Sequence, residues 1–138
     1  MSTHLKQKEE KILQILERLT QENAKGTPII VEGKKDIETL KTLAVKGKII
    51  SAKTGGKSFL DVISEIEKSK AREVILLLDF DRRGKEWTKR LKQNLEKTKI
   101  KPNLTFWTKL SKLVGKDVKD IESLATYMET LKRKICNS

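Results

Sequence analysis

Short apolar runs alternate with amphipathic patterns along this 138-residue chain, and that alternation limits the fold more than any other feature. The runs 29–31, 49–50 and 74–78 have the length and β-branched composition of strands buried on both faces. A fourth strand is expected after Pro102, on Leu104, Phe106 and Trp107. Helical spacing predicts helices over 4–23, 36–47, after Ser58, around 87–95, and over 121–135 with Asp120 as the cap. The order predicts an α/β fold, a Rossmann-like, about four-stranded, mainly parallel sheet flanked by helices, plus an N-terminal helix.

Two of the predicted strands end in carboxylates. Glu32-Gly33 follows the first strand, and Asp79-Phe80-Asp81 follows the third. Ligands of parallel sheets bind beyond the carboxyl ends of the strands, where the strand order reverses. If these two strands are neighbours, Glu32, Asp79 and Asp81 lie together at that edge. Polar residues often end buried strands, but this pairing across an αβα segment favours a functional site.

Three crowded carboxylates would repel one another unless a cation is shared among them. Mg²⁺ meets this need, with Mn²⁺ as the alternative, because it prefers oxygen ligands and keeps waters for substrate phosphates. Gly33 would let the backbone turn and approach a phosphate. Gly84 would do the same where the next helix begins, and the first amides of that helix would face an anion.

The segments 31–36 (Val-Glu-Gly-Lys-Lys-Asp) and 79–84 (Asp-Phe-Asp-Arg-Arg-Gly) resemble the two signature motifs of the Toprim family. Primases, topoisomerases, recombination-repair proteins and ribosomal-RNA maturation nucleases share this domain, and the resemblance spans residues 27 to 110. It implies that Glu32 is a metal ligand or general acid/base, and that Asp79 and Asp81 bind metal. All three would then be catalytic. Arg83 stands where many members have another acid, which favours one metal or a site completed by substrate.

The resemblance also indicates a domain division. Residues 1–26 are expected to form an N-terminal amphipathic helix, and residues 27–138 a Toprim domain with a C-terminal helix. The polar segment 1–11 lacks the apolar core of a signal peptide, and no apolar run is long enough to cross a membrane. A soluble cytoplasmic protein is therefore expected.

Basic residues surround both acidic motifs. The net charge of +12 favours a polyanionic partner, although a Lys-rich solvated surface explains the same number. The turn at Thr54–Gly56 would bring Lys57 to the same edge. The cations predicted to contact nucleic acid are Lys34, Lys35, Lys57, Arg82, Arg83 and Lys85. Any one of them is equally well explained as an ordinary surface charge, but their joint placement favours phosphodiester binding.

Several other residues have simpler structural interpretations. Trp87 and Trp107 lie in periodic apolar contexts and are expected in the core, and aromatic residues make up only 4% of the chain. Tyr127 lies in the predicted terminal helix, which is a poor position for a nucleophile. Asp120 is expected to cap that helix, with a role at the metal as the less favoured alternative.

The motifs therefore favour a Mg²⁺-dependent, nuclease-type enzyme that acts on RNA or DNA. The alternative is a non-catalytic nucleic-acid-binding module, or a subunit of an RNA-processing assembly. A primase or topoisomerase activity is set aside, because the chain has neither a zinc-binding module nor a second domain. Homodimerisation and protein partners in RNA processing stay open.

Overall fold

The computed structural model describes residues 2–53 and 56–137. Its elements are α1 (Ser2–Ala24), β1 (Ile29–Val31), α2 (Lys34–Thr42), β2 (Ile49–Ser51), α3 (Phe59–Lys68), β3 (Glu73–Leu76), α4 (Arg82–Lys97), β4 (Lys101–Asn103), α5 (Thr105–Val114) and α6 (Ile121–Cys136). Strands and helices alternate, so the predicted α/β fold with an N-terminal helix is confirmed. None of the described helices is long and apolar enough to cross a membrane.

The four strands form one parallel sheet in the order β2-β1-β3-β4. Ile29 of β1 pairs with Ile49 of β2 on one side and with Ile75 of β3 on the other. The chain therefore passes from β1 to one neighbour and later returns to the opposite side of β1. The strand order reverses between β1 and β3, and their carboxyl ends mark the expected ligand crevice.

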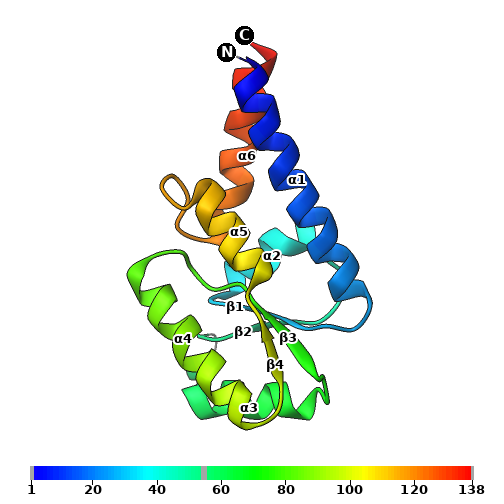
Figure 1. Ribbon diagram of the computed structural model, residues 1–138, viewed down its shortest axis with the longest axis vertical. Helices are drawn as coiled ribbons and strands as arrows, with labels where there is room; N and C mark the ends of the chain where they lie inside the picture. Colours follow the sequence, from blue (N-terminus) through cyan, green and yellow to red (C-terminus); the bar gives the residue numbers. More distant parts are fainter. Residues whose placement is uncertain (1, 54–55, 138) are drawn as a thin grey trace.

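Helices cover both faces of the sheet (Figure 1). Alternate strand residues point to opposite faces, so Ile29 and Ile75 pack with α1, α2, α5 and α6, whereas Ile30 and Leu76 pack with α3 and α4. α1 and α6 run side by side beyond the sheet, and their outer ends lie close together (Figure 1). The larger core thus joins the N-terminal and C-terminal helices to the sheet.

The predicted position of the fourth strand is wrong. β4 comprises Lys101–Asn103, whereas Phe106 and Trp107 lie in α5. Phe106, Leu110 and Val114 are buried at helical spacing, and helical packing against the core therefore overrides their strand propensity. The Asn103 side chain accepts a hydrogen bond from the Thr105 backbone N–H at 2.9 Å, at the point where the chain turns from β4 into α5.

Side-chain caps mark the starts of α3 and α6. Ser58 and Asp61 form the predicted reciprocal cap of α3, and Asp120 caps α6 by accepting from the Ser123 backbone N–H at 2.7 Å. α2 differs from the prediction because it begins at Lys34 and ends at Thr42. Ala44 follows with a φ of +73°, a left-handed conformation that ends the helix before Gly47.

Candidate functional site

Glu32 follows β1 at the switch point and is only 8% exposed. Its Oε2 accepts a hydrogen bond from the Asp79 backbone N–H at 3.1 Å. Its Oε1 accepts from the Lys53 ammonium, with which it also forms an ion pair. The Glu32 carboxylate is therefore held against the chain that leaves β3, and the pairing of β1 with β3 meets the condition on which this contact was expected.

The Asp79 and Glu32 side chains are joined by a hydrogen bond, which requires a proton on one of the two carboxyl groups. Burial, the hydrogen bond with the Glu32 side chain and the negative charge of Glu32 raise the pKa of Asp79 to about 8. Burial alone would raise the pKa of Glu32, but hydrogen bonds from Asp79 and Lys53 outweigh it and hold that pKa below its usual value. The two carboxyl groups therefore titrate together, and the pair keeps one proton above the usual pKa range of a carboxyl group.

Asp81 has a different local task. It is the N-cap of α4, and its Oδ1 accepts a hydrogen bond from the Gly84 backbone N–H at 2.8 Å. A Cβ added at Gly84 would lie 2.0 Å from the Asp79 carbonyl oxygen, so α4 packs directly on the backbone of Asp79. Glycine is therefore required at position 84 by packing within the protein rather than by the approach of a phosphate. The Gly84 backbone N–H is already bonded to Asp81.

Gly33 is less constrained than the sequence suggested. Its φ is −137°, an extended conformation, and an added Cβ would be 3.9 Å from its nearest neighbour, Asp36 Oδ2. The Gly33 backbone N–H donates to the same oxygen at 3.0 Å. The chain bends at Glu32 and Gly33, but Gly33 is in an extended conformation that other residues also adopt.

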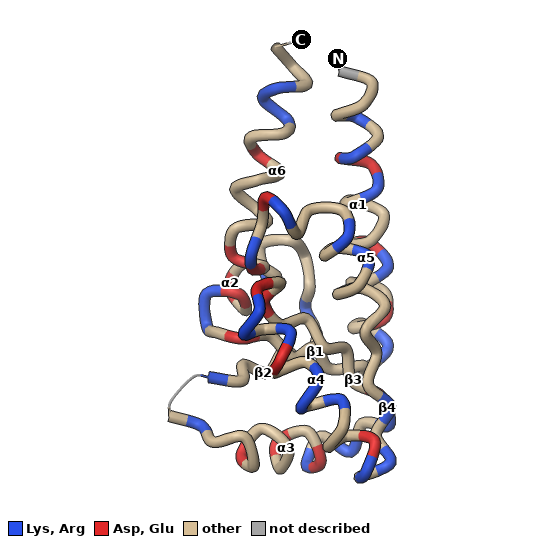
Figure 2. Tube along the Cα trace, turned by 60° about the vertical axis from the view of Figure 1, so that its left-hand side comes forward, with Lys and Arg blue, Asp and Glu red and all other residues tan. Residues whose placement is uncertain are grey.

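Asp36 joins the start of α2 to the start of α6. Its Oδ1 accepts from the Glu122 backbone N–H at 2.8 Å, and its Oδ2 binds Gly33. Burial raises the pKa of Asp36, these two hydrogen bonds oppose the rise, and the charges of Asp120 and Glu122 add to it. Acidic positions accordingly gather around α2 and the adjacent start of α6 (Figure 2).

We call Glu32, Asp79 and Asp81 the acidic edge.

The cations that flank the acidic edge are exposed. Lys34 and Lys35 lie in the first turn of α2, and Arg82, Arg83 and Lys85 lie in the first turn of α4. Lys35 Nζ lies 3.9 Å from Glu122 Oε1, and Arg82 Nε lies 3.6 Å from Glu86 Oε1. Pairs this exposed contribute little to stability, so the ammonium and guanidinium groups are available to solvent anions.

Lys57 faces a separate hollow. Its Nζ lies 2.7 Å from Glu65 Oε1 and donates to the Ser51 carbonyl oxygen at 3.1 Å. The hollow is also lined by Phe59, Trp87 and Arg90. Thr54 and Gly55, in the turn that was expected to bring Lys57 to the edge, lie outside the described residues.

Sequence reasoning missed Lys53. Its ammonium pairs with Glu32 and lies 5.4 Å from the centre of the Trp87 ring. A lysine next to a glycine-rich segment is common, and only the pairing of β1 with β2 brings this one to Glu32. Lys53 therefore supplies the single positive charge in direct contact with the acidic pair, among the residues whose placement is described.

The two predictions about aromatic residues outside the site agree with the structure. Trp107 packs on the larger core and donates its indole N–H to the Leu78 carbonyl oxygen at 3.0 Å. Tyr127 is half-buried in α6, with Lys8 Nζ 5.3 Å from its ring centre. Tyr127 has its partner away from the carboxylates, whereas Trp107 bonds to the backbone next to the acidic edge.

Comparison with known proteins identifies this arrangement. The family model of the Toprim domain matches residues 27–112, which include the acidic edge and all four strands. The chain belongs to the Toprim family. The match confirms the resemblance that the two acidic motifs indicated.

Archaeal proteins resemble this Toprim protein over most of its length. It is 39% identical over 120 residues to a UPF0292 protein of Methanocaldococcus jannaschii, covering 86% of this chain and 91% of the relative. A UPF0292 protein of Methanosarcina acetivorans is 36% identical over 126 residues, covering 91% and 85% respectively. A solved structure of an Aquifex aeolicus protein superposes with a TM-score of 0.67 at 26% identity, covering 80% of this chain and 94% of that one.

The donor set of this Toprim domain fits a divalent cation that has further ligands from solvent or substrate. Over residues 2–53 and 56–137, no three His, Cys, Asp or Glu side chains are grouped as a complete metal site. Two carboxyl groups do meet at the switch point, and the proton that they share supplies the second positive charge beside Lys53. A hard cation can take over that role, with waters completing its shell.

Proposed function

We propose that this Toprim protein is a Mg²⁺- or Mn²⁺-dependent nuclease that hydrolyses phosphodiester bonds of RNA or DNA. The observation that carries the proposal is the buried Glu32–Asp79 pair at the carboxyl ends of β1 and β3. Among the described residues Lys53 is the one cation in contact with the two carboxyl groups, so a second positive charge is needed before both can ionise.

Each residue of the acidic edge would have its own role. Glu32 would bind metal or act as general acid/base, since the Asp79 amide fixes the orientation of its carboxylate. Asp79 would bind metal after losing its proton. Asp81 would contribute an oxygen while its Oδ1 caps α4. A bound Mg²⁺ would neutralise charge on the phosphate and orient the attacking or leaving oxygen.

The exposed cations would hold the substrate beside these carboxylates. Lys34 and Lys35 begin α2, and Arg82, Arg83 and Lys85 begin α4, so both sets flank the same crevice. Arginine can bind phosphate with two parallel hydrogen bonds, and lysine contributes a mobile point charge. In this scheme they bind and orient the phosphodiester, and Lys57 would reach it from the neighbouring hollow.

A non-catalytic binding module, or a subunit of an RNA-processing assembly, is the second candidate. Two points favour it: Asp81 is engaged in capping α4, and Arg83 stands where the resemblance to the Toprim motif implies another acid. A binder would need the cations of α2 and α4 but not the Glu32–Asp79 pair. The two functions therefore make different demands on Glu32.

The deciding experiment uses the full chain with labelled structured RNA, single-stranded RNA and duplex DNA, in Mg²⁺, Mn²⁺ or EDTA. We expect metal-dependent cleavage of at least one substrate, and a loss of at least about a thousandfold in Glu32→Gln. Glu38→Gln, which neutralises an exposed carboxylate of α2, is the matched control and should cleave normally. Cleavage that persists in Glu32→Gln would refute the assignment, and tight binding without cleavage would support the module.

A further inference from the structure

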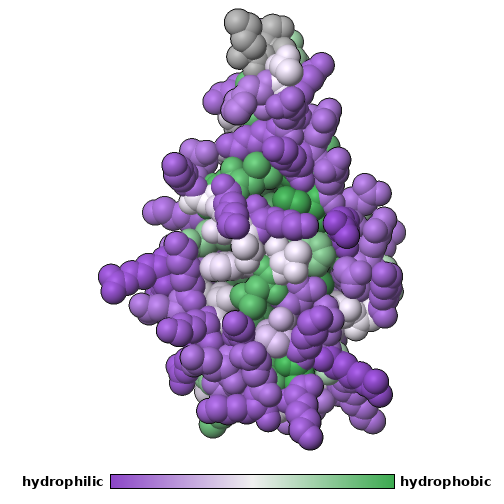
Figure 3. Space-filling view, in the orientation of Figure 1, coloured by the Kyte–Doolittle hydropathy of each residue, from purple (hydrophilic) through white to green (hydrophobic). Residues whose placement is uncertain are grey.

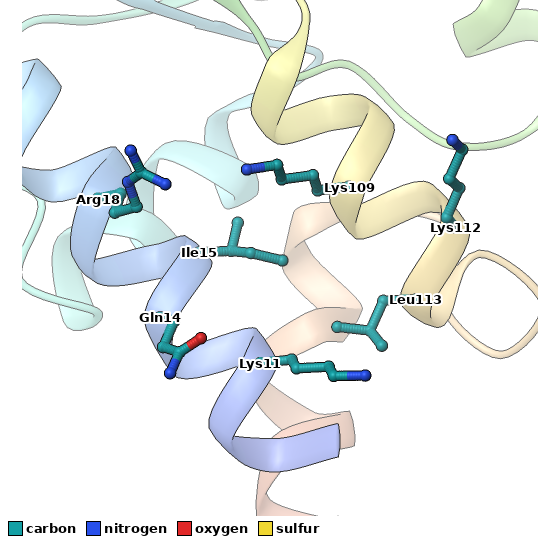
Figure 4. Close-up of a pocket in the computed structure, with 7 residues that line it drawn as sticks. All are labelled: Lys11, Gln14, Ile15, Arg18, Lys109, Lys112 and Leu113. Carbon is teal, nitrogen blue, oxygen red and sulfur yellow. The ribbon is translucent and has the colours of Figure 1, made fainter. Parts of the chain in front are cut away.

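A groove lies between α1 and α5, and it shares no residue with the acidic edge (Figure 4). Its volume is about 410 Å³. The lining residues are Lys11, Gln14, Ile15, Arg18, Lys109, Lys112 and Leu113, which we call the basic groove. Ile15 and Leu113 are half-buried and belong to the packed core, so the groove has an apolar floor and a polar rim. On this side of the molecule, apolar patches are framed by hydrophilic side chains (Figure 3).

The charge of the basic groove is uncompensated. Four of its seven lining residues are cationic, and none is acidic. Within the described residues, none of these four cations pairs with a carboxylate, whereas nearby Lys8 lies 3.7 Å from Asp117. Four exposed cations with no counter-charge repel one another and attract a polyanion by releasing its counterions.

The spacing of the cations suits an extended ligand. Lys11 and Arg18 stand two turns apart on one face of α1, about 10 Å along the helix axis. Lys109 reaches from α5 towards Arg18, and Lys11 reaches towards Leu113, so charges flank Ile15 from both helices (Figure 4). One small anion cannot touch both ends of this groove, whereas a chain with repeated charges can.

The groove continues along α1. A second hollow is lined by His4, Gln7 and Lys8 together with Lys11, Lys112 and Leu113, and the last three also line the basic groove. α1 therefore presents polar residues at helical spacing from His4 to Arg18, about 21 Å along its axis. Such a length corresponds to a polymer rather than to a metabolite.

α5 connects the basic groove to the acidic edge. Trp107, in the first turn of α5, donates its indole N–H to the carbonyl oxygens of Leu78 and Asp79, at 3.0 and 3.4 Å. Lys109 follows two residues later on the same helix. A polymer held on α5 is thereby placed in a fixed relation to the backbone of Asp79.

We infer that the basic groove binds the sugar-phosphate backbone of the nucleic acid substrate, outside the acidic edge. This inference deepens the proposed function and rests on nucleic acid as its partner. The cations would contact phosphates and the apolar floor would contact ribose rings. Contacts to phosphates position a nucleic acid without reading its bases, so the groove should bind irrespective of sequence.

The test measures binding in EDTA, which separates it from cleavage. Lys11→Gln, Arg18→Gln and Lys109→Gln are combined in one variant. The matched control combines Lys46→Gln, Lys70→Gln and Lys99→Gln. These remove three exposed charges that precede the amino ends of β2, β3 and β4, opposite to the carboxyl ends where the acidic edge lies. Fluorescence anisotropy with a labelled RNA hairpin and a duplex DNA gives Kd from about 50 to 300 mM salt.

We expect the groove variant to bind at least tenfold more weakly near 100 mM salt, and its log–log salt slope to fall by about two. The control should lose less than threefold. Lys11→Arg combined with Lys109→Arg should keep the affinity of the unaltered chain. Circular dichroism checks that all variants remain folded, as exposed side chains permit.

Equal losses in the groove variant and the control would overturn the inference, because net charge alone would then explain binding. Displacement of the RNA by polyglutamate at equal charge concentration would also overturn it, since the groove would not distinguish phosphate from carboxylate. If Glu32→Gln loses cleavage while the groove variant binds and cleaves normally, only the groove inference fails. If the groove variant loses binding and no protein cleaves any substrate, only the nuclease proposal fails.

Discussion

The acidic edge and the basic groove carry charge in opposite ways. At the edge, Glu32 is buried, bonded to the Asp79 amide and paired with Lys53. In the groove, Lys11, Arg18 and Lys109 are exposed and unpaired within the described chain. The stability of a buried charge depends on each of its polar neighbours, because a charge that loses hydration without gaining hydrogen bonds or a counter-charge destabilises the fold. Exposed charges act nearly additively and are screened by salt. Single substitutions should therefore matter greatly at the edge and little in the groove.

The largest expected difference in stability is between substitutions at two glycines next to the acidic edge. Gly84→Ala would force a Cβ to within 2.0 Å of the Asp79 carbonyl oxygen, so α4 must move. We expect a loss of about 2 to 3 kcal/mol in the free energy of unfolding, measured by urea denaturation. Gly33→Ala is the control, since its Cβ would meet nothing closer than 3.9 Å. Equal effects at the two glycines would contradict tight packing of α4 on Asp79.

Removing the charge of Asp79 should stabilise the metal-free protein at high pH. The pKa of Asp79 is raised, so its stabilising contribution is complete below an unfolded value of 3.8 and is lost as pH rises through about 8. Asp79→Asn carries no charge to bury, and in EDTA at about pH 9 it should gain about 1 to 2 kcal/mol, a figure reduced for its partial exposure.

Urea denaturation at several pH values checks this difference, which should shrink towards about pH 5. Asp117→Asn is a suitable control, because Asp117 is exposed and pairs only with Lys8 among the described residues. A variant Asp79→Asn that is less stable than the unaltered chain at high pH would show that the buried charge is already compensated.

Lys53 and a divalent ion should compete for Glu32. The Lys53 ammonium bonds to Glu32 Oε1, so its charge opposes a second cation at the pair. Lys53→Met should bind Mn²⁺ about tenfold more tightly, as followed by calorimetric titration. Lys34→Met removes an exposed charge that has no such bond and should change affinity less than threefold. Weaker binding in Lys53→Met would mean that Lys53 orients Glu32 for the metal.

A single change in the groove should have the smallest effect. Lys109→Gln removes one exposed charge, and we expect nucleic-acid affinity to fall two- to threefold with a salt slope lower by less than one. Anisotropy titrations in EDTA measure both quantities. A loss above tenfold from this one residue would mean that Lys109 makes a specific contact, and the contrast between groove and edge would then fail.

Much of the fold follows from local patterns. The strands at 29–31 and 49–50 were predictable from their apolar runs, and the caps at Ser58 and Asp120 from their side chains before an apolar period. The meeting of Glu32 with Asp79 was predicted on the condition that β1 and β3 pair, which they do. β4 was misplaced because Lys101–Asn103 is short and lies at the sheet edge, without the apolar alternation of a strand. Its pairing with β3 depends on tertiary contacts.

The details of the site depend on contacts that no local pattern encodes. Lys53 meets Glu32 across 21 positions, and Asp36 meets the Glu122 amide across 86. The Gly84 requirement likewise arises from packing against Asp79. The sequence therefore predicted that Glu32 meets Asp79, but it also grouped Asp81 with them, and Asp81 instead caps α4.

The central claim is that Glu32 and Asp79 together bind a divalent cation, and Mn²⁺ binding followed by electron paramagnetic resonance tests it most directly. The unaltered chain should bind Mn²⁺, and Glu32→Gln and Asp79→Asn should each bind at least about tenfold more weakly. Glu38→Gln, which alters an exposed carboxylate of α2, should bind within about twofold of the unaltered chain. Mn²⁺ binding that is as tight in Glu32→Gln as in the unaltered chain would contradict the account.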